Sequence, residues 1–481
     1  MTRPMTSPLP IPVTSPAVTP RRFPDDFVWG AATSAFQIEG ASREDGRGES
    51  IWDRFASEPG RISDGSDASV ACDHYHRVDE DLDVLQWLGV RSYRFSIGWP
   101  RILPTGRGAV NERGLDFYDR LVDRLLARGI EPFVTLNHWD LPQALHDEGG
   151  WPSRDTVGAF VTYAEVVMRR LGDRVRRVCT HNEPWCISTL GFGNGQHAPG
   201  ERSWPRALAA SHHLLLSHGH AVEAIRAVAP DARVGIVLNL VPTEPASPSD
   251  ADKEAARAFD GSFNRWFLDP LYGRGYPLDV IFDHVRAGHL PHAELPFVRE
   301  GDLRAIATRT DYLGINYYSR AVMRSTAVPE DDNAPVTVRA ADDKTDMGWE
   351  VAPGGLHTIL RRVHADYAPP RIYITENGAA YGTAPDASGR VRDLPRQRYL
   401  WSHFAAAHAA IEEGIPLAGY FLWSLLDNFE WGEGYSKRFG LFWVDYATQA
   451  RVAKDSAHLC RHIIRENALT ELEHDLARVQ S

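Results

Sequence analysis

The stretch VDEDLDVLQWLGVRSYRFSIGW, residues 78–99, contains the unit that decides the fold. Val78, Leu82, Leu85 and Gly89 recur at three- and four-residue spacing, which is typical of one face of an amphipathic helix. The apolar run SYRFSIGW follows almost at once and predicts a buried strand. A helix that runs directly into a buried strand indicates a layer of helices over a parallel sheet.

The same unit recurs along the chain. LDFYDRLVDRLLARGI has an apolar helical face, stops at Gly129, and runs into the strand pattern IEPFVTLNHW. Strand candidates begin near Phe27, Ser92, Ile130, Arg176, Arg233, Tyr312, Arg371 and Leu417, with helical patterns between them. Eight such units predict an α/β fold, a single (β/α)8 TIM barrel. The longer gaps, 239–311 and 318–371, are expected to be extended βα loops with short elements of their own.

Composition excludes several classes of function. The formal net charge of −12 argues against a nucleic-acid surface, which needs a basic face. No apolar run approaches the roughly 20 residues that span a bilayer, so we expect no membrane partner. The 4 cysteines are scattered and form no CxxC pair, which favours free thiols in a reducing cytoplasm.

The chain divides into three parts by composition. Residues 1–22 contain six prolines and many serines and threonines, and they lack the apolar core of a secretory signal. We expect a disordered tail there, a catalytic barrel over 23–465, and a C-terminal tail over 466–481.

Polar and aromatic side chains follow the predicted strands at their carboxyl ends, where barrel proteins keep their chemistry. Pro184 keeps Glu183 out of the α region and ends its strand. The residues at these ends are Gln37, Glu39, Arg94, Trp99, Asn137, His138, Trp139, Asn182, Glu183, Asn239, Asn316, Tyr317, Tyr318, Glu376, Asn377, Trp423, Asp427, Glu430 and Trp431. Buried polar groups must be paired, so such a cluster indicates a polar ligand.

Two of these acids, Glu183 and Glu376, end the fourth and seventh strands, which face each other across a barrel mouth. A carboxylate pair suits glycoside hydrolysis, in which one acid protonates the leaving oxygen and the other attacks or activates water. Amide, imidazole and carboxylate groups bind sugar hydroxyls, and tryptophan faces cover the C–H side of the ring.

Structural roles compete with these functional ones. His138 alone fits a hydrogen-bonded histidine at the barrel top, Trp423 and Trp431 fit the core, and Arg94 could close an ion-pair network. Cys179 and Cys186 flank Glu183, and we interpret both as small apolar residues.

The segment HHLLLSHGH, residues 212–220, has four histidines at helical spacing. They have no clear acidic partner in the sequence, so the pattern favours packing over a zinc site.

The motifs FVWGAATSAFQIEG, RFSIGWPRILPTG, TLNHWDLPQ, THNEP, GINYYS, ITENG and WSLLDNFEWGEGYSKRFGL occur in this order. Together they resemble the successive signatures of glycoside hydrolase family 1, the β-glucosidase family. The resemblance runs from about Phe23 to about Arg461, nearly the whole chain.

The resemblance implies a role for each matching residue. Glu183 in NEP matches the general acid/base, and Glu376 in TENG matches the nucleophile. The residues that match sugar-binding or nucleophile-contacting positions are Gln37, His138, Asn182, Glu430, Trp431, Trp423, Tyr318, Arg94 and Asn316, with Trp349 as a wall of the leaving-group site. A cation and a phenolic donor beside Glu376 would keep its pKa low, while that of Glu183 should be raised.

Departures from the family pattern bear on specificity. Members that act on 6-phosphorylated sugars resemble this chain at Lys437. They usually have serine at the position of Glu430 and tyrosine at the position of Phe439. We count Phe439 among the substrate-binding residues. An anionic Glu430 would repel a phosphate. Asn137, Asn194 and Gln196 stand at variable positions and leave the leaving-group preference open.

The expected activity is therefore that of a retaining β-glucosidase acting on small β-glycosides or short β-linked oligosaccharides without a metal or organic cofactor. A β-galactosidase or β-fucosidase of the same family remains an alternative. So does a non-catalytic sugar-binding barrel, although both catalytic acids are present. A metal-dependent barrel hydrolase would need converging histidines and acids. The oligomeric state stays open.

Overall fold

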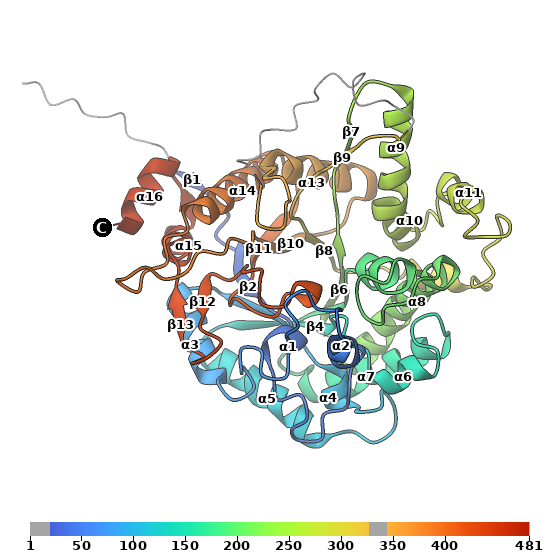
Figure 1. Cartoon of the computed structure of the whole chain (residues 1–481), viewed down its shortest axis with the longest axis horizontal. Coiled ribbons are helices and arrows are strands. Elements are labelled where there is room, and N and C mark those ends of the chain that lie inside the picture. The colour runs from blue at the N-terminus through green and yellow to red at the C-terminus, as the bar shows by residue number, and fades with distance from the viewer. Residues whose placement is uncertain (1–19, 327–343, 481) are drawn as a thin grey trace, which may run out of the picture.

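The centre of the molecule is a closed barrel of parallel strands, seen in a computed structural model that describes residues 20–326 and 344–480 (Figure 1). Around the barrel the order is β10-β11-β2-β3-β4-β5-β6-β8. The bounds are β2 (Val28–Ala32), β3 (Ser92–Ser96), β4 (Glu131–Asn137), β5 (Arg177–Asn182), β6 (Arg233–Asn239), β8 (Tyr312–Asn316), β10 (Ile372–Asn377) and β11 (Leu417–Trp423). Each begins within one residue of its predicted start, so the predicted TIM barrel is confirmed.

Helices surround the barrel on its outer side (Figure 1). The longer ones are α3 (Val78–Leu88), α5 (Glu112–Ala127), α7 (Asp155–Leu171), α8 (Trp204–Val228), α13 (Pro353–Tyr367), α14 (Leu394–Glu412) and α15 (Asp455–Glu466). In α3 the predicted face is buried through Val78, Leu82 and Leu85, and Gly89 ends the helix with φ 83°. That left-handed conformation is the usual reason for glycine at a helix end.

Short helices lie in the connections. These are α1 (Ala35–Ile38), α2 (Ile51–Ser57), α4 (Trp99–Ile102), α6 (Gln143–Asp147), α9 (Asp250–Asp260), α10 (Trp266–Leu271), α11 (Leu278–Arg286), α12 (Asp302–Ile306), the π-helices η1 (Cys186–Gly193) and η2 (Gly261–Arg265), and the 3-10 helix η5 (Trp431–Glu433). The long gap after β6 thus contains α9, η2, α10, α11 and α12, as expected for an extended loop. Residues 327–343 of the second long gap lie outside the described residues.

Aromatic side chains fill the barrel interior. Phe133 contacts Tyr312, Tyr373 and Phe421 edge to face, with ring centroids 5.1–5.8 Å apart. All four residues are buried. The interior is therefore a packed core below the barrel mouth and not a pore.

Three two-stranded sheets stand outside the barrel: β1 (Arg21–Arg22) with β14 (Ala468–Leu469), β7 (Thr243–Pro245) with β9 (Ala321–Met323), and β12 (Phe442–Val444) with β13 (Arg451–Ala453). The last helix, α16 (Leu472–Gln480), follows β14. Of the expected N-terminal tail, residues 1–19 lie outside the described residues. Across 20–326 and 344–480, every helix is too short or too polar to cross a membrane.

Candidate active site

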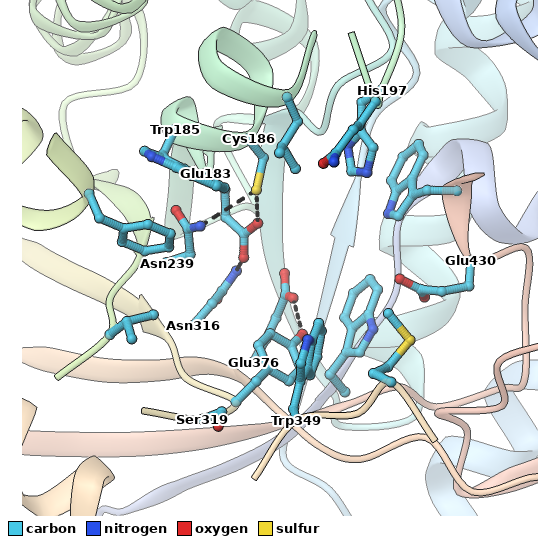
Figure 2. Close-up of a pocket in the computed structure, with 18 of the residues that line it drawn as sticks. Glu183, Trp185, Cys186, His197, Asn239, Asn316, Ser319, Trp349, Glu376 and Glu430 are labelled. Atoms are coloured by element: carbon cyan, nitrogen blue, oxygen red, sulfur yellow. Dashed lines mark hydrogen bonds between the residues drawn. The ribbon is translucent and has the colours of Figure 1, made fainter. Parts of the chain in front are cut away.

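A cavity of about 970 Å3 opens at the carboxyl ends of the strands, where the sequence predicts the chemistry. Figure 2 shows Glu183, Asn316, Glu376 and Glu430 around it. The predicted residues that line it are His138, Asn182, Glu183, Asn316, Tyr318, Trp349, Glu376, Trp423, Glu430, Trp431 and Phe439. Residues as far apart in the chain as His138 and Phe439 therefore meet in one place.

Glu183 directly follows β5 in a strained backbone conformation. Its φ is +50°, a region that costs a non-glycine residue about 1–3 kcal/mol. Its N–H donates to the Val237 carbonyl at 2.9 Å, which holds the turn against β6. The strand therefore ends at this glutamate and its side chain is directed into the cavity (Figure 2).

Two side chains donate hydrogen bonds to the Glu183 carboxylate. Asn316 Nδ2 lies 2.6 Å from Oε1, and Cys186 Sγ lies 3.1 Å from Oε2. Asn239 Nδ2 in turn lies 3.5 Å from Cys186 Sγ (Figure 2). We expected Cys186 to act only as a small apolar residue, and the structure corrects this, because its thiol lines the cavity and contacts the carboxylate.

Glu376 lies near the end of β10 and is held by a cation and a phenol. Arg94 Nη1 is 2.6 Å from Oε1, and Tyr318 OH donates to Oε2 at 2.6 Å. Arg94 is itself fully buried. Both donors satisfy the charged form of the carboxylate, which agrees with the predicted neighbours of this residue.

The two carboxyl groups affect each other's ionisation. Burial raises the pKa of Glu183 to about 7, and the negative charge of Glu376 adds to that rise. Burial also raises the pKa of Glu376, against the opposing effects of Arg94 and Tyr318. The expectation of a low pKa for Glu376 is therefore wrong in direction, because desolvation outweighs its donors. Since the guanidinium contacts Glu376 and not Glu183, Glu376 ionises first.

The hydrogen bonds of Asn182 determine which ring nitrogen of His138 carries the proton. Asn182 Oδ1 accepts from Arg94 Nη2 at 2.7 Å and from Asn316 Nδ2 at 3.0 Å. The amide nitrogen therefore faces His138 Nε2, 3.1 Å away. Burial lowers the pKa of His138 well below its ordinary value, so the ring is neutral with Nε2 as acceptor and its proton on Nδ1. Among the described residues Nδ1 has no hydrogen-bond partner, and the atom is itself buried.

The remaining predicted sugar contacts surround Trp423 and Trp431. The His138 ring lies nearly parallel to both indoles, with centroids 5.8 and 5.9 Å away. Gln37 Nε2 lies 3.5 Å from Glu430 Oε2 and is itself fully buried outside the cavity lining. Burial and the charges of Glu376 and Glu183 raise the pKa of Glu430 to about 8. This carboxyl is therefore mostly protonated at pH 7, contrary to the expected anion.

Several strand-end residues of the predicted cluster do not reach the cavity. Glu39 pairs with Arg101, and the rings of Trp99 and Tyr163 stack at 4.9 Å. The others outside the cavity lining are Tyr317, Asn137, bonded to His181, Asn377, bonded to Tyr420, and Asp427, paired with Lys454 and Arg438. Their side chains bond to neighbouring elements outside the cavity. Of these residues only Asn137 and Asn377 lie within a strand, where adjacent side chains point to opposite faces.

One wall of the cavity consists of residues that sequence reasoning missed. The Trp185 and Phe263 rings lie 4.3 Å apart, and Phe259 stacks on Phe263 at 5.3 Å. Trp185 directly precedes η1, Phe259 lies in α9 and Phe263 lies in η2, and all three line the cavity. The only signal in the sequence was their aromatic character, which is equally typical of a core. Of the variable positions, Gln196 lines the cavity, whereas Asn194 and Asn137 do not.

Three of the four histidines of α8 have partners in the packing around that helix. His212 contacts Tyr276 OH and Asp302, His213 contacts the Trp151 carbonyl, and His218 contacts Thr180. Within the described ranges, no group of three or more histidine, cysteine, aspartate or glutamate side chains is placed to hold a metal. All four cysteines are free and buried.

Comparison with known proteins gives one consistent result. The sequence model of glycosyl hydrolase family 1 matches residues 19–469. The β-glucosidase A of Thermotoga maritima is 45% identical over 94% of this chain and 99% of its own. A bifunctional β-D-glucosidase/β-D-fucosidase of Bifidobacterium breve is 43% identical over 93% of this chain and 99% of its own. The structure of the T. maritima family 1 β-glucosidase with isofagomine lactam superposes with a TM-score of 0.87, at 44% identity, covering 94% of this chain and all of that one.

Proposed function

Because the chain belongs to glycosyl hydrolase family 1 and is a glycoside hydrolase of the β-glucosidase type, we propose that Glu183 and Glu376 are its acid/base and its nucleophile in a retaining reaction. The observation that carries this assignment is the unequal environment of the two carboxyl groups. Arg94 and Tyr318 hold Glu376 as the anion, whereas Glu183 has a pKa of about 7 and keeps a proton to donate.

In the first step the Glu376 carboxylate attacks the anomeric carbon and forms an ester bond to the sugar. The bond from that carbon to the leaving oxygen breaks, and Glu183 gives its proton to this oxygen. Ester formation removes the negative charge of Glu376. Since that charge helps to raise the pKa of Glu183, the pKa then falls, so Glu183 stays ionised after giving up its proton and can accept one from water.

In the second step Glu183 takes a proton from water, and the water oxygen attacks the anomeric carbon. The ester bond breaks, Glu376 returns to its pairing with Arg94, and the product keeps the β configuration of the substrate. Tyr318 can donate to the Glu376 oxygen that leaves, as it does in the resting site. No step requires a group beyond these side chains and water.

The glycone is proposed to bind between the indoles and the carboxyl of Glu430. The His138 ring lines this part of the cavity, and Trp423 offers an apolar face. Gln37 sits behind Glu430 and orients its carboxyl. The same set could accept an axial hydroxyl, so β-fucosidase or β-galactosidase activity beside β-glucosidase activity is included in the proposal; the B. breve relative is named for a β-fucosidase activity.

The proposed substrates are small β-glycosides or short β-linked oligosaccharides, because the cavity of about 970 Å3 is of the size that takes small ligands. The four free thiols support a reducing cytoplasm as the site of action. A sugar-binding protein without catalysis has no support in the site, since both carboxyl groups and their donors are present.

Azide rescue tests the two roles separately. In Glu376→Ala a cavity opens below the anomeric carbon, so azide should displace an activated β-aryl leaving group in one step and give an α-glycosyl azide. In Glu183→Ala the covalent intermediate still forms, and azide needs no base, so the product should be a β-glycosyl azide. The anomeric coupling constants in proton NMR spectra distinguish the products.

Glu433→Ala is the matched control, because this acid lines the same cavity outside the proposed pair. It should yield no glycosyl azide. Exchanged configurations in the two test variants would exchange the roles of Glu183 and Glu376, and no azide product in either variant would refute the assignment.

A further inference from the structure

A second cavity, of about 590 Å3, lies at the opposite end of the barrel from the candidate active site. Its lining comes from the amino ends of β4, β5, β6, β8 and β10 and from α8. Six arginines surround it, namely Arg176, Arg177, Arg226, Arg233, Arg309 and Arg371, and we refer to them as the arginine pocket. This concentration of positive charge is unusual for a chain with a net charge of −12.

Two carboxylates line the arginine pocket, and both are already engaged. Glu131 pairs with Arg177. Asp311 pairs with Arg226 at 2.9 Å and with Arg233 at 3.7 Å, and it also accepts the Val234 N–H. Both acids of the pocket are therefore already paired with guanidinium groups.

Two of the arginines lack any partner. Within the described residues, the side chains of Arg309 and Arg371 form no ion pair, hydrogen bond or ring contact, and both residues are exposed at the rim. Arg177, by contrast, is held in place: its Nε lies 3.3 Å from Tyr373 OH, and its side chain is 18% exposed. The pocket thus combines a positioned guanidinium with free ones.

Like charges that converge on a concave surface repel one another and concentrate anions there. Guanidinium groups bind phosphate oxygens through paired hydrogen bonds and cannot lose their charge. The volume of about 590 Å3 lies in the range of small-molecule sites, and it is larger than a single phosphate needs.

We propose that the arginine pocket binds a small molecule with several phosphate groups, such as an inorganic polyphosphate or a nucleoside triphosphate. The site is independent of glycoside hydrolysis. Phe133, Tyr312, Tyr373 and Phe421 fill the barrel between the two cavities, so the ligand does not compete with the sugar. Because it binds the folded chain only, the ligand raises the melting temperature.

Titration of the whole protein with tripolyphosphate at low ionic strength tests the proposal. Calorimetry should give saturable binding with one site per chain, together with a rise in melting temperature and unchanged hydrolysis of an aryl β-glucoside. ATP in competition with tripolyphosphate distinguishes a nucleotide site from a general polyphosphate site. Binding of ATP at least ~10-fold tighter would favour the nucleotide.

The double variant Arg309→Gln/Arg371→Gln should weaken tripolyphosphate binding at least ~10-fold, since both side chains are free to contact the ligand. It should remain folded and active, because no protein contact is lost. The matched control is Arg120→Gln/Arg398→Gln, which removes two exposed arginines without described partners elsewhere and the same net charge.

Three results would overturn the proposal. These are an equal loss of affinity in both double variants, inhibition of hydrolysis that is competitive with the glucoside, and an absence of saturable tripolyphosphate binding up to ~1 mM. Binding of an acidic peptide with no binding of tripolyphosphate would also overturn it, because the site would then recognise a protein.

Discussion

The Glu183 carboxylate accepts one hydrogen bond from an amide and one from a thiol. Replacing the thiol tests directly what sets the pKa of Glu183. The Cys186 hydrogen bond stabilises the charged carboxylate and so lowers the pKa of Glu183, against the larger effect of burial. In Cys186→Val this donor is lost and the pKa should rise above about 7. The alkaline limb of the kcat/KM profile, where Glu183 loses the proton it must donate, should therefore move up by a few tenths to ~1 pH unit.

A serine at the same position should keep the limb near its wild-type pH, because its hydroxyl also donates. Cys460→Ala is the control, since Cys460 is also buried but lies in α15. A limb that stays in place in the valine variant would show that the thiol does not tune Glu183.

We expect the charge of Glu430 to determine how fast the enzyme hydrolyses a 6-phosphorylated glucoside. Its pKa of about 8 makes it neutral at lower pH, so its repulsion of a phosphate grows as the pH rises through that value. Lys437 does not line the cavity, and its Nζ donates to the Asp346 carbonyl. We expect aryl 6-phosphoglucosides to be hydrolysed ~100-fold more slowly than glucosides, with the ratio widening above pH 8.

The measurement is kcat/KM for the two aryl substrates across pH, in the wild type and in Glu430→Ser. The serine variant should lose the widening, because it has no ionisable group there. Equal values for the two substrates at every pH would refute the expectation.

At the scale of elements, the strands were predictable and the loops were not. Continuous apolar runs such as SYRFSIGW identify buried parallel strands by composition alone, and β3 begins at the predicted Ser92. The side to which a strand-end residue points depends on the local turn, so Glu39 and Trp99 were placed in the cluster although they pack behind it. The contact of Cys186 was missed because the sequence does not distinguish a cysteine that contacts a carboxylate from a cysteine that packs in the core.

The segment of α9 and η2 supplies an apolar wall of the cavity, and the periodicity of apolar residues in the sequence did not reveal it. Phe263 packs between Trp185 and Phe259 and is 7% exposed in the structure without ligand. We expect Phe263→Ala to lower kcat/KM ~10-fold for glucosides with large apolar leaving groups, since burying a phenyl ring contributes about 1.5–3 kcal/mol. Methyl β-glucoside, which does not reach the wall, should be affected little.

Phe282→Ala is the matched control, because Phe282 is 50% exposed on α11 and does not line the cavity. Equal losses on both substrates in Phe263→Ala would indicate a general structural defect and not a leaving-group contact.

At the scale of the whole molecule, the two ends of the described chain meet beside the barrel. β1 pairs with β14 in antiparallel register, with Arg21 opposite Leu469. Asp475 in α16 accepts from Trp401 Nε1 at 2.9 Å, and Leu469 and Leu476 are buried. The proposed division gives residues 466–481 no part in catalysis, and these contacts are consistent with a role in stability.

Leu469→Ala separates stability from catalysis. Leu469 is fully buried, so removal of its side chain should lower the free energy of unfolding by about 2–5 kcal/mol through lost burial and a new cavity. The kcat/KM of the folded enzyme should stay unchanged, because Leu469 does not line the catalytic cavity.

Leu278→Ala is the control, since Leu278 is 68% exposed and its loss should change stability by less than ~0.5 kcal/mol. Thermal melts and initial rates at a temperature well below both transitions measure the two quantities. If Leu469→Ala had the same melting temperature as the wild type, the pairing of the chain ends would contribute nothing to stability. A fall in kcat/KM without a change in melting temperature would mean that the ends of the chain act on the active site.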